Sequence, residues 1–143
     1  MVLVKNIVFL FEEYHKEKIL YPESGGSMNN HEIGKKGELL AQEHLKEMGY
    51  KIIDVNYRCQ LGEIDIIAYK DSYIVFIEVK TRNSNNYGLP YESVSIIKQE
   101  KIRKVALYYL KANNMFQKDC RFDVVSIEKR GTDYTCEIIQ DAF

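Results

Sequence analysis

Cysteine and histidine are scarce in this sequence, and neither is arranged as a zinc site. Cys59, Cys120 and Cys136 are far apart and odd in number, and no two of them form a Cys-x-x-Cys pair. We therefore expect reduced thiols, as in a cytosolic protein, rather than a disulfide framework or a zinc knuckle. The three histidines contain no His-Glu-x-x-His arrangement, and we expect His44, on the apolar face of a helix, to be packed in the core.

The sequence also has no apolar run that approaches the ~20 residues needed to span a bilayer. The N-terminal run Ile7–Phe11 is too short for the apolar part of a signal peptide. Glu12 and Glu13 follow it, where a cleavage site would be expected. We therefore predict a cytoplasmic protein with no membrane partner.

An excess of charge of one sign is missing as well. The formal net charge is -1, so no overall positive field draws the chain towards nucleic acid. This balance counts against a simple charge-driven nucleic-acid binder, but not against an enzyme with a local basic strip. With 143 residues, 45% hydrophobic and 29% charged, the chain is long enough for one domain with a core and too short for two.

The first 27 residues differ in composition from the rest. Ser24–Ser27 read Ser-Gly-Gly-Ser, the composition of a flexible linker, and Met28 follows directly. We predict that residues 1–27 are an N-terminal extension and that residues 28–143 are the functional domain. An upstream extension, a tag and a misassigned start all fit the first segment.

Hydrophobic periodicity predicts an αβββαβ order followed by one further strand. The predicted helices run from Ile33 to Gly49 and from about Ser93 to Asn113, with Ile97 on the apolar stripe of the second. The predicted strands cover residues 50–58, 62–69, 73–81, 121–127 and 134–139, and a polar loop covers 83–90. This order predicts an α/β protein with a mixed central sheet flanked by helices.

Charged residues interrupt two neighbouring strands of that sheet. Asp65 lies on the strand 62–69, and Glu78 and Lys80 lie on the strand 73–81. Residues two apart on a strand share a face, so Glu78 and Lys80 point the same way while Ile77 and Val79 point into the core. The short polar segment between the strands closes a hairpin, which brings Asp65 beside the pair.

Two interpretations of this group are open. A charge on a buried strand costs free energy unless it is paired or binds a metal. Two acidic oxygen donors and an ammonium at one edge of a sheet suit a Mg²⁺-dependent phosphodiesterase, whereas an ion-pair cluster is the structural alternative. The apolar run Ile74–Ile77 leads directly into Glu78, which indicates a nearly buried strand and favours the metal site.

The element order, with Asp65 followed by Glu78-Val79-Lys80, resembles the core of the restriction-endonuclease-like PD-(D/E)xK nucleases. Flanking segments narrow the resemblance to the YraN-like bacterial family, which is related by fold to archaeal Holliday-junction resolvases. The resemblance covers about residues 31–130. It rests on five segments in the right order: Gly34–Glu38, Gly62–Ala68, Phe76–Arg82, Tyr87–Pro90 and Arg121–Val125.

The resemblance implies a role for each residue of the group. Asp65 and Glu78 would be catalytic ligands of Mg²⁺ or Mn²⁺, and Glu38 on the first helix would complete the metal shell. Lys80 would orient or deprotonate the attacking water and offset charge on the scissile phosphate. The chain departs from the motif because no proline precedes Asp65; Glu63 stands two positions before it, as an extra metal ligand or an ion-pair partner.

Basic residues on the second predicted helix suggest where a nucleic acid would lie. Lys98, Lys101 and Lys104 are neighbours at three-residue spacing. With Arg58 and Arg82 they would form a strip that follows a phosphate backbone. A solvated helix face explains the same lysines equally well.

These observations predict a metal-dependent endonuclease that hydrolyses DNA, including branched, structured or single-stranded DNA. The alternative is a non-catalytic nucleic-acid-binding accessory protein in recombination or DNA uptake, and a third hypothesis is a protein–protein adaptor. Resolvase-like relatives act as two-fold dimers, so the resemblance also implies a homodimer.

Overall fold

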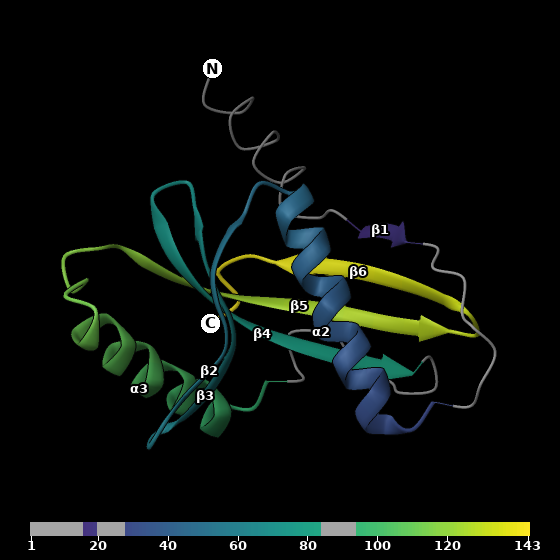
Figure 1. Ribbon diagram of the computed structural model, residues 1–143, viewed down its shortest axis with the longest axis horizontal. Helices are drawn as coiled ribbons and strands as arrows, with labels where there is room; N and C mark the ends of the chain where they lie inside the picture. Colours follow the sequence, from purple (N-terminus) through teal and green to yellow (C-terminus); the bar gives the residue numbers. More distant parts are fainter. Residues whose placement is uncertain (1–15, 20–27, 84–93) are drawn as a thin grey trace.

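The computed structural model describes residues 16–19, 28–83 and 94–143 (Figure 1). The strands form a six-stranded sheet in the order β1-β6-β5-β4-β3-β2, in which β4 and β5 are parallel and the other neighbouring pairs are antiparallel. The predicted mixed sheet and α/β class are confirmed, and the order from α2 to β5 matches a restriction-endonuclease-like core. The elements are β1 (Lys16–Ile19), α2 (Asn30–Glu47), β2 (Lys51–Cys59), β3 (Gly62–Lys70), β4 (Tyr73–Asn83), α3 (Ile96–Ala112), β5 (Cys120–Arg130) and β6 (Asp133–Ile139).

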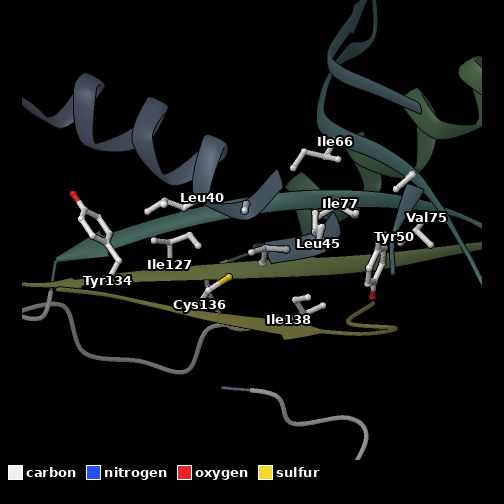
Figure 2. Close-up of a cluster of buried hydrophobic side chains, with 13 residues drawn as sticks. Leu40, Leu45, Tyr50, Ile66, Val75, Ile77, Ile127, Tyr134, Cys136 and Ile138 are labelled. Atoms are coloured by element: carbon white, nitrogen blue, oxygen red, sulfur yellow. The ribbon is translucent and has the colours of Figure 1, made fainter. Parts of the chain in front are cut away.

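The two helices cover different faces of the sheet. Consecutive side chains of β4 alternate between two apolar clusters, because strand residues point to opposite faces in turn. Val75 and Ile77 pack with residues of α2, whereas Ile74 and Phe76 pack with residues of α3. Figure 2 shows side chains of α2 facing those of β4, β5 and β6 in the first cluster. The helix α3 also supplies the crossover that a parallel β4–β5 pair requires.

The start of α2 is set by a capping box rather than by its first apolar residue. The Asn29 side chain accepts a hydrogen bond from the Glu32 N–H at 3.0 Å, and the Glu32 carboxylate accepts one from the Asn29 N–H at 2.8 Å. The helix therefore begins three residues before the predicted Ile33. It ends before Gly49, whose φ of +84° suits glycine.

One glycine brings α2 close to the part of β4 that carries the charged residues. A Cβ on Gly37 would collide with the side chain of Thr81. Only a residue without a side chain allows this approach of helix to strand. As a result Glu38, the next residue, lies near the end of β4 where the site is built.

The predicted position of Ile97 on the apolar stripe of α3 is wrong. Ser95 caps the helix, which begins at Ile96, and the Ile97 side chain is 80% exposed. The buried positions of α3 are Ile102, Val105, Ala106, Tyr109 and Leu110. One turn before Ile102 lies Lys98, so the first turn of α3 directs a lysine, and not an isoleucine, towards the sheet.

Periodicity did not predict β1. Lys16–Ile19 pairs antiparallel with β6, from Lys16 opposite Glu137 to Ile19 opposite Tyr134. It lies within the predicted N-terminal extension, whose Ser24–Ser27 linker is outside the described residues, as are residues 84–90 of the predicted polar loop. The division at residue 28 stays a prediction.

The expectations for the cysteines and for His44 are met. Cys59, Cys120 and Cys136 are free thiols, and His44 is fully buried on α2. Neither of the described helices is long and apolar enough to cross a membrane.

Candidate active site

The site lies where β3 and β4 separate. Their pairing ends at Ile66 opposite Ile77, after which β3 continues beside β2 and β4 beside β5. Asp65 immediately precedes Ile66 on β3 and is the first residue beyond the paired region. Its Oδ2 accepts a hydrogen bond from the backbone N–H of Val79 at 2.8 Å. The aspartate thus supplies the acceptor that a paired strand would have offered. The sequence predicted that the group lies at an edge of the sheet. This prediction is wrong, because β2 and β5 flank the two strands and the group therefore lies inside the sheet.

Glu78 is a buried carboxylate held by two lysines. Its residue is 4% exposed, and its Oε1 lies 3.2 Å from Lys80 Nζ and 3.6 Å from Lys98 Nζ. The first contact agrees with the prediction that Glu78 and Lys80 share a face; Val79 instead packs against the cluster beneath α2. The second contact comes from α3 and was not predicted. Two ammonium groups offset the cost of burying this charge.

The surroundings of Asp65 raise its pKa from 3.8 to about 7. Burial is the largest cause, and repulsion from Glu78 is the next; the Val79 hydrogen bond opposes them. Glu38 raises the pKa further and Lys98 lowers it, so both residues lie within electrostatic range of Asp65. A carboxyl group that titrates near neutral pH beside two other acids is characteristic of functional sites.

Glu63 does not join this group. Its Oε2 lies 3.3 Å from Arg58 Nε, and both side chains are largely exposed on the β2–β3 hairpin. Glu63 is therefore an ion-pair partner of Arg58 in this structure and does not lie with the proposed metal ligands.

The structure divides the predicted basic strip. Arg58, Lys98 and Lys101 line a hollow of about 340 Å³. Arg82 lines a separate hollow of about 290 Å³ beside the start of α2, and Lys104 is exposed on α3 outside both. The other residues that line the larger hollow are Cys59, Gln60, Leu61, Gly62 and Glu63.

Gly62 allows the β2–β3 turn to lie against α3. Its φ is +144°, and a Cβ there would lie 2.9 Å from Lys101 Cε and 3.2 Å from Val105 Cγ2. A side chain at this position would strain the backbone and would force the end of Lys101 and the Val105 methyl group to shift.

The carboxylates suit a hard divalent cation. Within residues 16–19, 28–83 and 94–143, no three His, Cys, Asp or Glu side chains are already gathered closely enough to hold a metal ion. Mg²⁺, however, keeps several waters and needs only one or two protein carboxylates. Asp65 and Glu78 are such a pair, since burial and then repulsion from Glu78 raise the pKa of Asp65. The two carboxylates could therefore hold Mg²⁺ or Mn²⁺, and Glu38 lies near enough to raise the pKa of Asp65.

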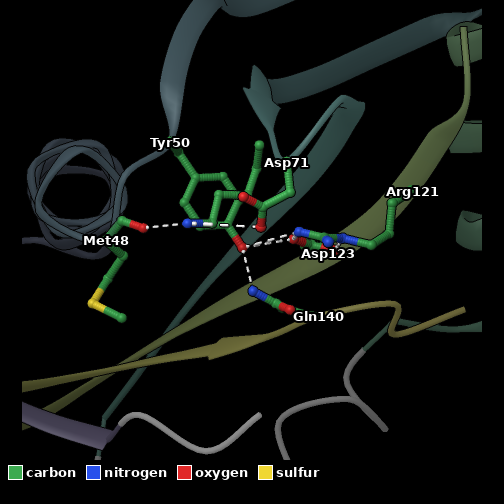
Figure 3. A network of polar contacts seen from close by, with 7 residues as sticks. Met48, Tyr50, Asp71, Arg121, Asp123 and Gln140 are labelled. Carbon is green, nitrogen blue, oxygen red and sulfur yellow. Dashed lines mark hydrogen bonds and ion pairs between the residues drawn. The ribbon is translucent and has the colours of Figure 1, made fainter. Parts of the chain in front are cut away.

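A second polar cluster, at the other end of β4, is structural (Figure 3). Arg121 donates two hydrogen bonds to Asp123, at 2.8 and 2.9 Å, and Tyr50 donates one to Asp123 at 3.0 Å. Gln140 donates to the Tyr50 oxygen at 3.1 Å, and burial followed by the charge of Asp123 raises the pKa of Tyr50. Hydrogen bonds within the cluster bind these polar groups, so it stabilises the fold. Two of its residues, Arg121 and Asp123, belong to the Arg121–Val125 segment.

Sequence reasoning recognised Lys98 as basic but missed its place beside Glu78. The signal was present, because counting back one turn from Ile102 reaches Lys98. The incorrect assignment of Ile97 to the apolar stripe hid it.

Comparison with known proteins places the chain in a family. The model of "Uncharacterised protein family UPF0102" matches residues 37–127. A UPF0102 protein of Syntrophus aciditrophicus is 46% identical over 114 residues, which cover 80% of this chain and 90% of that protein. One of Dictyoglomus turgidum is 43% identical over 118 residues, covering 81% of this chain and all of that protein. The chain belongs to the UPF0102 family, the YraN-like family that its motifs indicated.

Proposed function

We propose that this protein is a divalent-cation-dependent nuclease that hydrolyses phosphodiester bonds in DNA. One observation carries the proposal: two buried or half-buried carboxylates, Asp65 and Glu78, meet at a strand separation with Lys80 and Lys98 against one of them. Burying these charges costs folding free energy, whereas apolar residues at the same positions would extend the sheet without that cost. A purely structural role therefore does not explain the arrangement.

Asp65 and Glu78 would hold the cation, Mg²⁺ or Mn²⁺, and Glu38 would add an oxygen from α2. When bound, the cation polarises a phosphoryl oxygen and lowers the pKa of a bound water. Asp65 is fixed by the Val79 N–H, which leaves its other oxygen available. A cation between the two carboxylates would offset the repulsion between their negative charges.

Lys80 would act on the reacting phosphate. Its Nζ is held 3.2 Å from Glu78 Oε1, and its side chain is 32% exposed. A fixed ammonium of this kind stabilises charge that develops on phosphoryl oxygens and orients the attacking water. Glu78 therefore has two roles, as a ligand and as the group that positions Lys80.

The substrate we propose is DNA, including branched or single-stranded DNA. The hollow lined by Arg58, Lys98 and Lys101 supports this choice, since Lys98 joins it to Glu78 and basic side chains bind phosphates without regard to base sequence. Branched DNA and a homodimer are proposed from the resemblance to resolvases.

A non-catalytic nucleic-acid-binding protein is the second candidate. Lys80 and Lys98 already balance the charge of Glu78 without a cation, and the basic hollow would bind DNA without the carboxylates. This candidate predicts salt-dependent DNA binding that Asp65→Asn leaves unchanged and that loss of the lysines weakens.

Cleavage assays with labelled single-stranded, duplex and four-way-junction DNA separate the candidates. We expect cleavage in Mg²⁺ or Mn²⁺ but not in EDTA, and its loss in Asp65→Asn, Glu78→Gln and Lys80→Ala. Asp71→Asn is the matched control, because Asp71 is an exposed acid on the β3–β4 turn. Cleavage that persists in all three site variants would refute the assignment.

A further inference from the structure

Lys98 occupies a position that normally belongs to the apolar face of a helix. It lies one turn before the buried Ile102, while its neighbour Ile97 is exposed. The first turn of α3 contains no acidic residue, so Lys98 has no acid in its own turn. Its ammonium instead reaches across to β4 and lies 3.6 Å from Glu78 Oε1.

The same side chain lines the basic hollow beneath the β2–β3 turn. Arg58 and Lys101 line that hollow too, and the acid on its wall, Glu63, is already paired with Arg58. The Lys98 side chain is 32% exposed, so it is not locked in the core. One ammonium therefore borders both the carboxylate pair and the hollow.

We propose that Lys98 is a phosphate-binding residue that couples cation binding at Asp65 and Glu78 to the binding of a DNA phosphodiester in the hollow. The inference rests on the proposed function and adds a regulatory link to it. Without a cation, Lys98 neutralises Glu78. With a divalent cation on Glu78, Lys98 leaves that oxygen and binds the phosphate beside Arg58 and Lys101.

Electrostatics gives the direction of the coupling. A divalent cation on Glu78 weakens the attraction between Glu78 and Lys98, which is the longer of its two lysine contacts, and repels the Lys98 ammonium at short range. A phosphodiester in the hollow offers the ammonium an anion in exchange. Each ligand should therefore strengthen the other, and by linkage the two enhancements must be equal.

Two binding measurements test this coupling. Calorimetry gives the affinity for Mg²⁺ and Ca²⁺, and fluorescence anisotropy gives the affinity for a short labelled oligothymidylate with and without Ca²⁺, which also binds carboxylate oxygens. A gel checks that the oligonucleotide stays intact. We expect Ca²⁺ to raise the affinity of the wild type about tenfold, within the common range for coupled sites.

Three lysines on one helix provide matched variants. Lys98→Met should abolish the enhancement, so that Ca²⁺ leaves DNA binding unchanged or weakens it by screening phosphates. Lys101→Met should lower DNA affinity in both conditions but keep the enhancement, because Lys101 lines the hollow without contacting Glu78. Lys104→Met, outside the hollow, should keep the enhancement at the wild-type ratio.

The possible failures are distinguishable. Absence of Mg²⁺ and Ca²⁺ binding would overturn the proposed function together with this inference. Cation binding with an enhancement that is absent in the wild type, or retained in Lys98→Met, would overturn this inference alone. Circular dichroism of each variant confirms that the fold is intact.

Discussion

Replacing Asp65 by asparagine should make the protein more stable at neutral and alkaline pH, although it removes a functional group. The folded state raises the pKa of Asp65 from 3.8 to about 7. Between about pH 4 and pH 7 the folded protein therefore holds a proton that the unfolded chain has lost, so stability falls as pH rises through this window. Above about pH 7 the folded protein bears the full cost of an ionised Asp65.

The magnitude follows from the size of the shift. A difference of about three pH units at ~1.4 kcal/mol per unit corresponds to about 4 kcal/mol, an upper limit because Asp65 is half-buried. Asparagine is never charged, and its side-chain oxygen can still accept the hydrogen bond from the Val79 N–H. The variant should therefore match the wild type near pH 4 and exceed it by up to about 4 kcal/mol near pH 8.

Urea unfolding in EDTA at several pH values between about 4 and 8 measures the difference directly. Asp71→Asn should follow the wild-type profile, because Asp71 is an exposed acid on a turn. Addition of Mg²⁺ near pH 8 should stabilise the wild type and not the Asp65→Asn protein. A variant that is less stable than the wild type near pH 8, or that keeps the wild-type slope, would contradict the proposed electrostatics of the site.

Four further substitutions test the packing and the hydrogen bonds of the fold. Gly37→Ala should lower stability by roughly 1–3 kcal/mol, measured by urea unfolding, because the new methyl group collides with Thr81. Ile97→Ser should change the free energy of unfolding by less than about 0.5 kcal/mol, whereas Ile102→Ala should lower it by about 2–5 kcal/mol. Equal losses in the two variants would show that Ile97 is buried. Tyr50→Phe should cost about 1–3 kcal/mol in thermal or urea unfolding, since it leaves buried hydrogen-bonding groups of the second polar cluster without their partner.

Local patterns were sufficient to predict most of the fold. The hairpin between β3 and β4 follows from two apolar runs and a short polar segment, and the ladder from Lys70–Tyr73 to Ile66–Ile77 has the register that brings Asp65 and Glu78 together. The αβββαβ order follows from a change between helical and strand periods. These features depend on residues close in sequence, which is why the sequence alone predicts them.

The missed features depend on contacts between distant segments. The strand β1 is defined by pairing with β6, more than a hundred residues later in the chain, and its four residues carry no distinctive period. The place of Lys98 beside Glu78 depends on the rotation of α3 about its axis, which the buried residues from Ile102 onward determine. A one-residue error in that rotation exchanges an exposed isoleucine for a lysine of the site.

The separation of β3 from β4 explains why the carboxylates can exist inside the sheet at all. In a continuous ladder the Val79 N–H would donate to a backbone carbonyl of the neighbouring strand, and a side-chain acceptor would not be needed. Once the strands part, Asp65 satisfies that donor, and Lys98, which lines the hollow beside α3, contacts Glu78. The apolar clusters on both faces of β4 hold the strands on either side of this gap. The strand separation therefore explains why a buried aspartate has a backbone donor at this point of the sheet, and why it lies close enough to Glu78 for burial and the charge of Glu78 to raise its pKa.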